Sequence, residues 1–163
     1  MTIWADADSL PEDVRRLICR RAALEARAAE ASGQSPRFRA VFIAAKMPPI
    51  DLGPGVEAET VEEGEGAADD RIVERATNGD LAVTRDLPLA ERLAEAGARV
   101  LNDRGDLFTA ENVRERRSLR DRATELRALG LAPESPRRSS RGAREMKAFA
   151  DALDRELAKK VTQ

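Results

Sequence analysis

Residues 2–12 read TIWADADSLPE, an apolar and partly β-branched run that stops at two aspartates and leads into a helix-start signal. The run TIWA predicts a buried first strand, because a strand that is covered on both faces is apolar at successive positions. Ser9 and Glu12 have the spacing of a capping box, which predicts that a helix starts here with Ser9 as its N-cap. The chain is therefore expected to open as strand, loop and helix, with Asp6 and Asp8 in the loop.

The alternation of apolar runs and helical segments continues along the chain. Further strands are predicted near residues 40–44, 56–61, 81–84 and 99–101, and helices near 69–78, 88–96, 109–129 and 143–160. Strands that alternate with helices form parallel sheets covered on both faces. We therefore predict an α/β fold of three layers, with a mostly parallel sheet, helices on both faces and C-terminal helices packed on it. Residues 1–129 are expected to form the α/β domain, and residues 130–163 a linker and an amphipathic helix.

The composition excludes several classes of protein and of mechanism. The 163 residues are 42% hydrophobic and 36% charged with a net charge of −2, which is typical of a globular protein and not of a polybasic or disordered one. The absence of histidine excludes catalytic triads and histidine-ligated metals. The single cysteine, Cys19, excludes an internal disulfide and fits a reducing cytoplasm. Because no apolar run approaches the roughly 20 residues of a membrane helix, we expect a cytoplasmic protein without a membrane partner.

Aspartates follow the predicted strands, at the edge where parallel sheets bind their ligands. Asp6 and Asp8 follow the first strand, Asp86 follows a later one, and Asp69 and Asp70 open the helix before it. Carboxylates that lie together repel, so such a cluster needs a bound cation or shifted pKa values. Since all the ligands are oxygens, Mg²⁺ or Mn²⁺ is the expected cofactor. All five aspartates are predicted metal ligands, and Asp6, Asp69 and Asp86 are the predicted catalytic set for phosphodiester hydrolysis.

Most of these acids also have a simpler interpretation. Asp8, Asp86 and the pair at 69–70 stand where helix caps stand, and a cap alone would explain each of them. Asp6 fits that interpretation least, because it ends a strand. Asp80 precedes its strand, so it is expected at the opposite edge of the sheet in a structural role.

The acids lie within motifs that resemble a known family. The chain from residue 2 to about residue 129 is similar to the YaiI/YqxD family of uncharacterised bacterial proteins, with a weaker similarity at the C-terminal helix. The similarity is carried by IWADAD at 3–8, DDRIV at 69–73, GDLAVTRDLPLA at 79–90 and LNDRG at 101–105. The sequence has Ser9-Leu10 where that family usually has Ala-Cys before the proline, so no role of a family cysteine carries over.

That family looks PIN-like. Asp6 at the end of its strand, D-x-x-I at 69–72 and V-T-x-D at 83–86 resemble three acidic motifs of PIN-domain ribonucleases. The resemblance implies that these acids bind Mg²⁺ or Mn²⁺ and that the protein cuts single-stranded RNA. The further acid that PIN domains carry between their first and third motifs has no clear counterpart, since residues 44–49 contain only Lys46 as a charged residue.

Arginines gather in the C-terminal third of the chain. From residue 113 to residue 144, ten arginines face four acids, a local excess of six positive charges. Arg137, Arg138 and Arg141 in the linker are predicted to bind nucleic-acid phosphates. The arginines at 114–122 have the alternative of local ion pairs on a solvated helix. With four phenylalanines and no tyrosine, the chain offers no base-stacking platform for sequence-specific recognition.

Three functions remain open at this stage. The leading one is a metal-dependent PIN-like nuclease acting on single-stranded RNA. The second is a phosphohydrolase of the haloacid-dehalogenase type, because Asp6-Ala7-Asp8 after a strand imitates its opening motif, although the chain has few lysines for the remaining motifs. The third is a non-catalytic PIN-like module that binds RNA or a protein partner.

Overall fold

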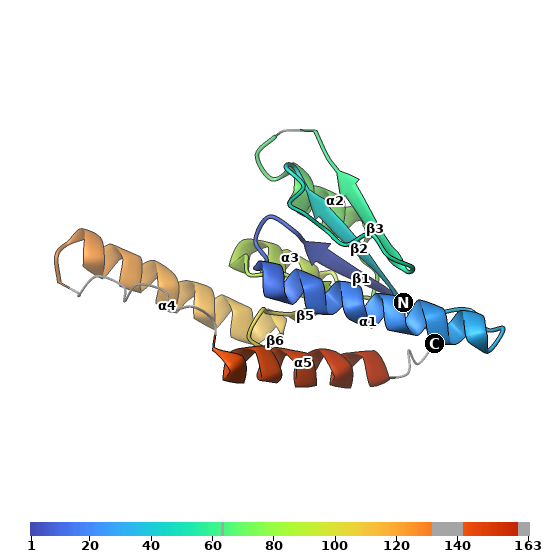
Figure 1. Cartoon of the computed structure of the whole chain (residues 1–163). Helices are drawn as coiled ribbons and strands as arrows, with labels where there is room; N and C mark the ends of the chain where they lie inside the picture. Colours follow the sequence, from blue (N-terminus) through green and yellow to red (C-terminus); the bar gives the residue numbers. More distant parts are fainter. Residues whose placement is uncertain (63, 132–141, 160–163) are drawn as a thin grey trace.

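A computed structural model describes residues 1–62, 64–131 and 142–159 and has one six-stranded sheet at its centre (Figure 1). The strand order is β3-β2-β1-β4-β5-β6, and every neighbouring pair is parallel except β5 and β6. The strands are β1 (Thr2–Asp6), β2 (Arg39–Ala44), β3 (Val56–Thr60), β4 (Leu81–Val83), β5 (Arg99–Leu101) and β6 (Leu107–Phe108). The helices are α1 (Glu12–Ala31), α2 (Ala67–Arg75), α3 (Leu87–Glu95), α4 (Ala110–Ala128) and α5 (Ala143–Ala158).

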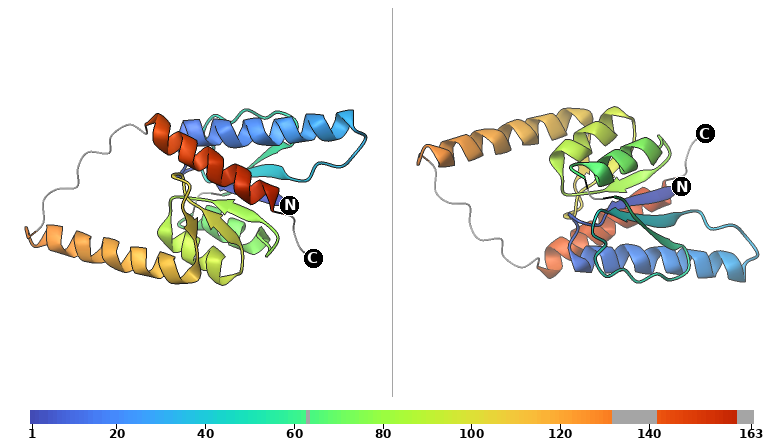
Figure 2. Two further views of the ribbon diagram at one scale, coloured as in Figure 1. Left: turned by 90° about the horizontal axis from the view of Figure 1, so that it is seen from below. Right: turned by 90° about the horizontal axis from the view of Figure 1, so that it is seen from above.

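Two hydrophobic cores lie on the two faces of the sheet, because successive side chains of a strand point to opposite faces. Ile3 and Ala5 of β1 pack with α1 and with Phe149 of α5, whereas Trp4 packs with α2 and α3. Figure 2 shows α1 and α5 on one side of the sheet and α2 and α3 on the other. The predicted three-layer α/β fold with a mostly parallel sheet is therefore confirmed.

Strand β6 is the one strand of the described residues that the sequence analysis did not anticipate. It contains two residues, which is too short for a periodic pattern, and it pairs antiparallel with β5. The turn before it is held by Asn102, whose side-chain carbonyl accepts hydrogen bonds from the amides of Arg104 (2.9 Å) and Asp106 (2.8 Å). Gly105 in this turn has a φ of +92°, a conformation that favours glycine.

Helix α4 begins on the domain and then extends away from it (Figure 1). Thr109 is its N-cap and forms a capping box with Asn112. Val113 in the first turns is buried, whereas Leu119 and Leu126 further along are exposed. Only the start of α4 thus contributes to a core. No helix within the described ranges is both long and apolar enough to cross a bilayer.

Candidate functional site

The carboxyl ends of β1 and β4 bring Asp6 and Asp86 to the same edge of the sheet. Asp6 ends β1 on the face that also carries Trp4, so its side chain is directed toward α2 and α3. Asp6 is only 4% exposed to solvent. Asp86 stands at the start of α3, and Asp69 lies in the first turn of α2. The fold therefore places the three predicted catalytic acids on elements that meet at this edge.

Thr84 holds the carboxylate of Asp6 in position. Its hydroxyl donates a hydrogen bond of 2.7 Å to Oδ2 of Asp6 and accepts one of 3.0 Å from the amide of Asp86. The other oxygen of Asp6, Oδ1, accepts only a long hydrogen bond of 3.4 Å from the amide of Ser9. Asp6 is thus fixed through one oxygen and keeps free acceptor capacity on the other.

The pKa of Asp69 reflects the electrostatic environment at this edge of the sheet. Burial and the negative charges of Asp6 and Asp86 together raise the pKa of Asp69 from 3.8 to about 6, although Arg92 partly opposes them. Among the described residues, none donates a hydrogen bond to the Asp69 side chain, and none forms an ion pair with any of these three acids. The three therefore form a cluster of negative charge in which no acid has a direct ion-pair partner among the described residues; we call it the acidic cluster.

The other predicted ligands have partners of their own. Asp70 forms an ion pair of 2.7 Å with Arg92, and the exposed Asp8 accepts a hydrogen bond of 3.0 Å from the amide of Ala45. Asp86 does cap its helix, since its Oδ1 accepts from the amide of Leu89 at 2.9 Å. The cap interpretation is thus correct for Asp86, but it does not exclude membership of the acidic cluster, because the charge of Asp86 still acts on Asp69.

One acid of this edge, Asp103, was not predicted from the sequence as a site residue. Asp103 follows β5 and is buried, and its Oδ2 lies 3.2 Å from Nε of Arg85. The rule used for Asp6, an acid just after an apolar strand, would have found Asp103. Because Arg85 neutralises it, Asp103 borders the acidic cluster without adding an unpaired charge.

The prediction that Ser9 caps the first helix is wrong. Helix α1 begins at Glu12 with Pro11 at the N-cap and without a side-chain hydrogen bond there. The Ser9 hydroxyl instead accepts a hydrogen bond of 3.2 Å from the amide of Arg85. The physical reason is that the β4–α3 loop lies against this serine and presents an amide that needs an acceptor.

The residues fit a hydrated hard cation better than a closed metal cage. Within the described residues, no three acidic or cysteine side chains lie close enough to form a preformed metal site. Mg²⁺ usually keeps several waters and contacts only one or two carboxylates, so outer carboxylates can act through water. The oxygen donors and the mutual repulsion within the acidic cluster match that mode. Metal binding by these aspartates remains a prediction.

Asp80 lies at the opposite edge, as predicted, and is structural. It accepts hydrogen bonds from the amide of Thr2 (2.7 Å), the indole of Trp4 (3.1 Å) and the hydroxyl of Thr77 (2.9 Å). Burial by itself would raise the pKa of Asp80, but these hydrogen bonds outweigh it and lower the pKa below its ordinary value. Asp80 thus joins β1 and the turn before β4.

The arginines at the start of α4 are neutralised by other parts of the fold. Arg114 and Arg117 form ion pairs with Glu91 of α3 at 3.5 and 2.6 Å, and Arg116 pairs with Asp106 at 2.8 Å. They form ion pairs, as the alternative interpretation held, although with partners distant in sequence. Arg137, Arg138 and Arg141 lie outside the described residues.

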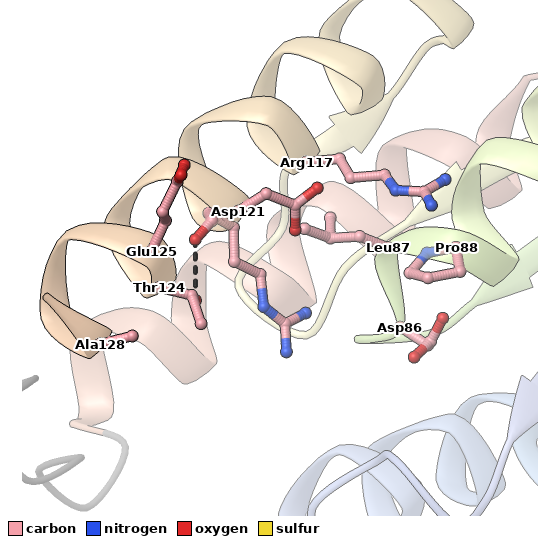
Figure 3. A pocket seen from close by; sticks show the side chains of 9 residues that line it. Asp86, Leu87, Pro88, Arg117, Asp121, Thr124, Glu125 and Ala128 are labelled. Atoms are coloured by element: carbon pink, nitrogen blue, oxygen red, sulfur yellow. Dashed lines mark hydrogen bonds between the residues drawn. The ribbon is translucent and has the colours of Figure 1, made fainter.

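A cleft of about 640 Å³ separates α4 from the start of α3 (Figure 3). Asp86 stands at one end of the cleft and Ala128 at the other. Its charged lining consists of two arginines and three acids, namely Arg117, Arg120, Asp86, Asp121 and Glu125. The lining therefore carries no excess of positive charge that would attract a polyanion.

Comparison with known proteins identifies a family. Residues 4–159 match the family model described as "Uncharacterized BCR, YaiI/YqxD family". The chain is 44% identical over 162 residues to a UPF0178 protein of Treponema pallidum, covering 98% of this chain and 82% of the relative. It is 40% identical over 161 residues to a UPF0178 protein of Myxococcus xanthus, covering 99% of this chain and 97% of the relative. A UPF0178 protein of Treponema denticola is 37% identical over 163 residues, with 100% and 96% covered.

Proposed function

We propose, from the premise that this chain belongs to the YaiI/YqxD family, that it is a divalent-metal-dependent nuclease that hydrolyses phosphodiester bonds in single-stranded RNA. The observation that carries the proposal is the acidic cluster, in which burial and the charges of Asp6 and Asp86 raise the pKa of Asp69 and outweigh the opposing charge of Arg92. A partly buried group of like charges at the ligand-binding edge of a parallel sheet is a typical feature of a functional site.

The chemistry follows from which carboxylate oxygens are free. Oδ2 of Asp6 is engaged by Thr84, so Oδ1 is the oxygen that would face a ligand. Oδ1 of Asp86 caps α3, which leaves Oδ2 for the same purpose. With a pKa of about 6, Asp69 would hold a proton part of the time near neutral pH and would release it when positive charge approaches. A bound Mg²⁺ or Mn²⁺ would supply an activated water and stabilise the leaving oxygen.

A second candidate is a non-catalytic module that binds RNA or a protein partner. Two observations favour it: the described residues contain no ready-made group of three metal ligands, and residues 44–49 offer no further acid. In such a module the fold and the acidic cluster are the same, but RNA is not hydrolysed.

RNA cleavage separates the two candidates. We expect labelled single-stranded RNA to be cut in the presence of Mn²⁺ or Mg²⁺, not in EDTA, and not by Asp6→Asn. The matched control is Asp70→Asn, which removes a carboxylate that already has a cation partner, Arg92. Cleavage that survives Asp6→Asn would contradict the proposal, and RNA binding without any cleavage would favour the second candidate.

A further inference from the structure

Helix α1 carries arginines on two sides, and they differ in how far carboxylates neutralise them. Arg21 forms a two-point ion pair with α5, with both distances 2.7 Å. Arg16 has only a 3.9 Å contact with Glu12, and both side chains are more than 70% exposed, at 71% and 74%. In the part of the chain that the structure describes, Arg20 and Arg27 form no ion pair. The sequence analysis did not single out these arginines.

The three weakly paired arginines form a row along the helix. Arg20 and Arg27 follow Arg16 by four and eleven residues, which at 3.6 residues per turn places them about 40° and about 20° from it around the axis. With a rise of about 1.5 Å per residue, the row is about 16 Å long. Arg16, Arg20 and Arg27, here called the arginine row, thus present three positive charges in one line on an exposed surface.

A groove runs along the arginine row. It has a volume of about 310 Å³, and its far wall is the loop between β2 and β3, which contributes Asp51 and Gly53. The loop lies close to α1: a Cβ on Gly55, whose φ is +73°, would come within 3.0 Å of the Ala22 carbonyl oxygen. The groove is lined by three arginines against one aspartate, so its charge is positive, unlike that of the cleft beside α4.

The helix and the loop that line the groove both start at the carboxyl edge of the sheet. Helix α1 starts shortly after Asp6, and the loop starts at Ala45, whose amide is bonded to Asp8. Figure 1 shows the start of α1 on the side of the sheet where β1 ends. A chain molecule that lay in the groove would therefore be led to this edge.

We propose that the arginine row binds the phosphate backbone of single-stranded RNA and directs it to the acidic edge. The substrate class rests on the proposed function, whereas the binding surface rests on the charges and the groove. Arginine suits phosphates because its planar fork donates several hydrogen bonds. No aromatic residue lines the groove, so binding is electrostatic, independent of base sequence and strongly dependent on salt.

The test is RNA binding in EDTA, where cleavage cannot interfere. A fluorescent oligouridylate of about 12 nucleotides, within the site sizes of such proteins, is titrated with protein at several salt concentrations. In the triple variant Arg16→Gln, Arg20→Gln, Arg27→Gln we expect the slope of log K against log salt to flatten by about 2, at about 0.7 per lost phosphate contact. The control variant Arg114→Gln, Arg116→Gln, Arg117→Gln removes the same charge from α4 and is expected to leave the slope nearly unchanged.

Each of these binding results would overturn the proposal: wild-type protein that does not bind the oligonucleotide at low salt, an equal loss in both triple variants, or binding that the α1 variant retains. Thermal unfolding of both variants shows whether they are folded. If the wild type binds RNA, the α1 variant does not, and no metal supports cleavage, the result would contradict the proposed nuclease activity but support RNA binding in the groove. If the α1 variant cleaves RNA as well as the wild type does, the result would support the nuclease activity and contradict RNA binding in the groove.

Discussion

Carboxylates at the two edges of the sheet have opposite electrostatic surroundings. At the amino edge, Asp80 is 8% exposed and is surrounded by donors, and its pKa is below the ordinary value. At the carboxyl edge, burial and the charges of Asp6 and Asp86 raise the pKa of Asp69 to about 6. A buried acid that is surrounded by donors stabilises the fold, whereas one surrounded by acids destabilises it and marks a binding site.

The largest expected effect is that of Asp80→Ala. This change leaves the Trp4 indole and the Thr77 hydroxyl without their acceptor, and it removes the bond to the amide of Thr2. We expect the free energy of unfolding to fall by about 3 kcal/mol, because hydrogen bonds to a charged group are strong and buried donors without acceptors are costly. Urea denaturation measures the loss.

The matched control for Asp80→Ala is Asp70→Ala. Asp70 is an exposed acid with one ion pair, and removing it should cost less than about 1 kcal/mol. Equal losses in the two variants would show that the amino-edge acid is no more structural than a surface one.

A smaller effect of opposite sign is expected for Asp69→Asn in EDTA. The pKa of Asp69 is raised from 3.8 to about 6, so the folded state binds more protons than the unfolded state between these values. Its contribution to stability is therefore full below pH 3.8 and is lost as the pH rises through about 6. The full shift corresponds to about 3 kcal/mol, and because Asp69 is partly exposed we expect the variant to gain about 1 kcal/mol at pH 8.

The measurement is urea denaturation of wild type and Asp69→Asn at pH 8 and near pH 4. The difference between the two proteins should be present at pH 8 and should shrink toward zero at the lower pH. A variant that is less stable than wild type at pH 8 would mean that Asp69 has a stabilising partner, and the contrast between the edges would fail.

The smallest effect is a shift in the titration of Asp69 itself. In Asp6→Asn one of the negative charges that disfavour the ionised form of Asp69 is gone, so the pKa of Asp69 should move from about 6 toward 3.8. Carboxyl ¹³C chemical shifts followed with pH by NMR measure it. Asp70→Asn should move it less, because Asp6 raises this pKa more than Asp70 does. The reverse order would place Asp69 outside the acidic cluster.

The fold, and the edge of the sheet at which each acid lies, could be predicted from the sequence because both depend on local patterns. The apolar run before Asp6 and the one after Asp80 each predict a strand and a direction, and a parallel sheet then puts these acids at opposite edges. The same pattern applied to residues 99–101 would have added Asp103. The two residues of β6 are too few to carry any pattern.

The ion pairs could not be predicted from the sequence, because they join residues that are distant in sequence. The sequence offered only local ion pairs as an alternative for the arginines at 114–122, but Arg117 pairs with Glu91 of α3. The arginine row on α1 was likewise invisible as a site, since only the folded chain shows which arginines lack carboxylates. Ser9 has the sequence pattern of a cap, yet it bonds to the amide of Arg85, 76 residues away.

Calorimetric titration with Mn²⁺ tests most directly whether the carboxyl edge is a metal-binding site. We expect that wild type binds Mn²⁺, that Asp6→Asn weakens binding about tenfold or more, and that Asp70→Asn weakens it less, because Asp70 is already paired with Arg92. Wild type that does not bind Mn²⁺, or Asp6→Asn that binds it equally well, would contradict the account.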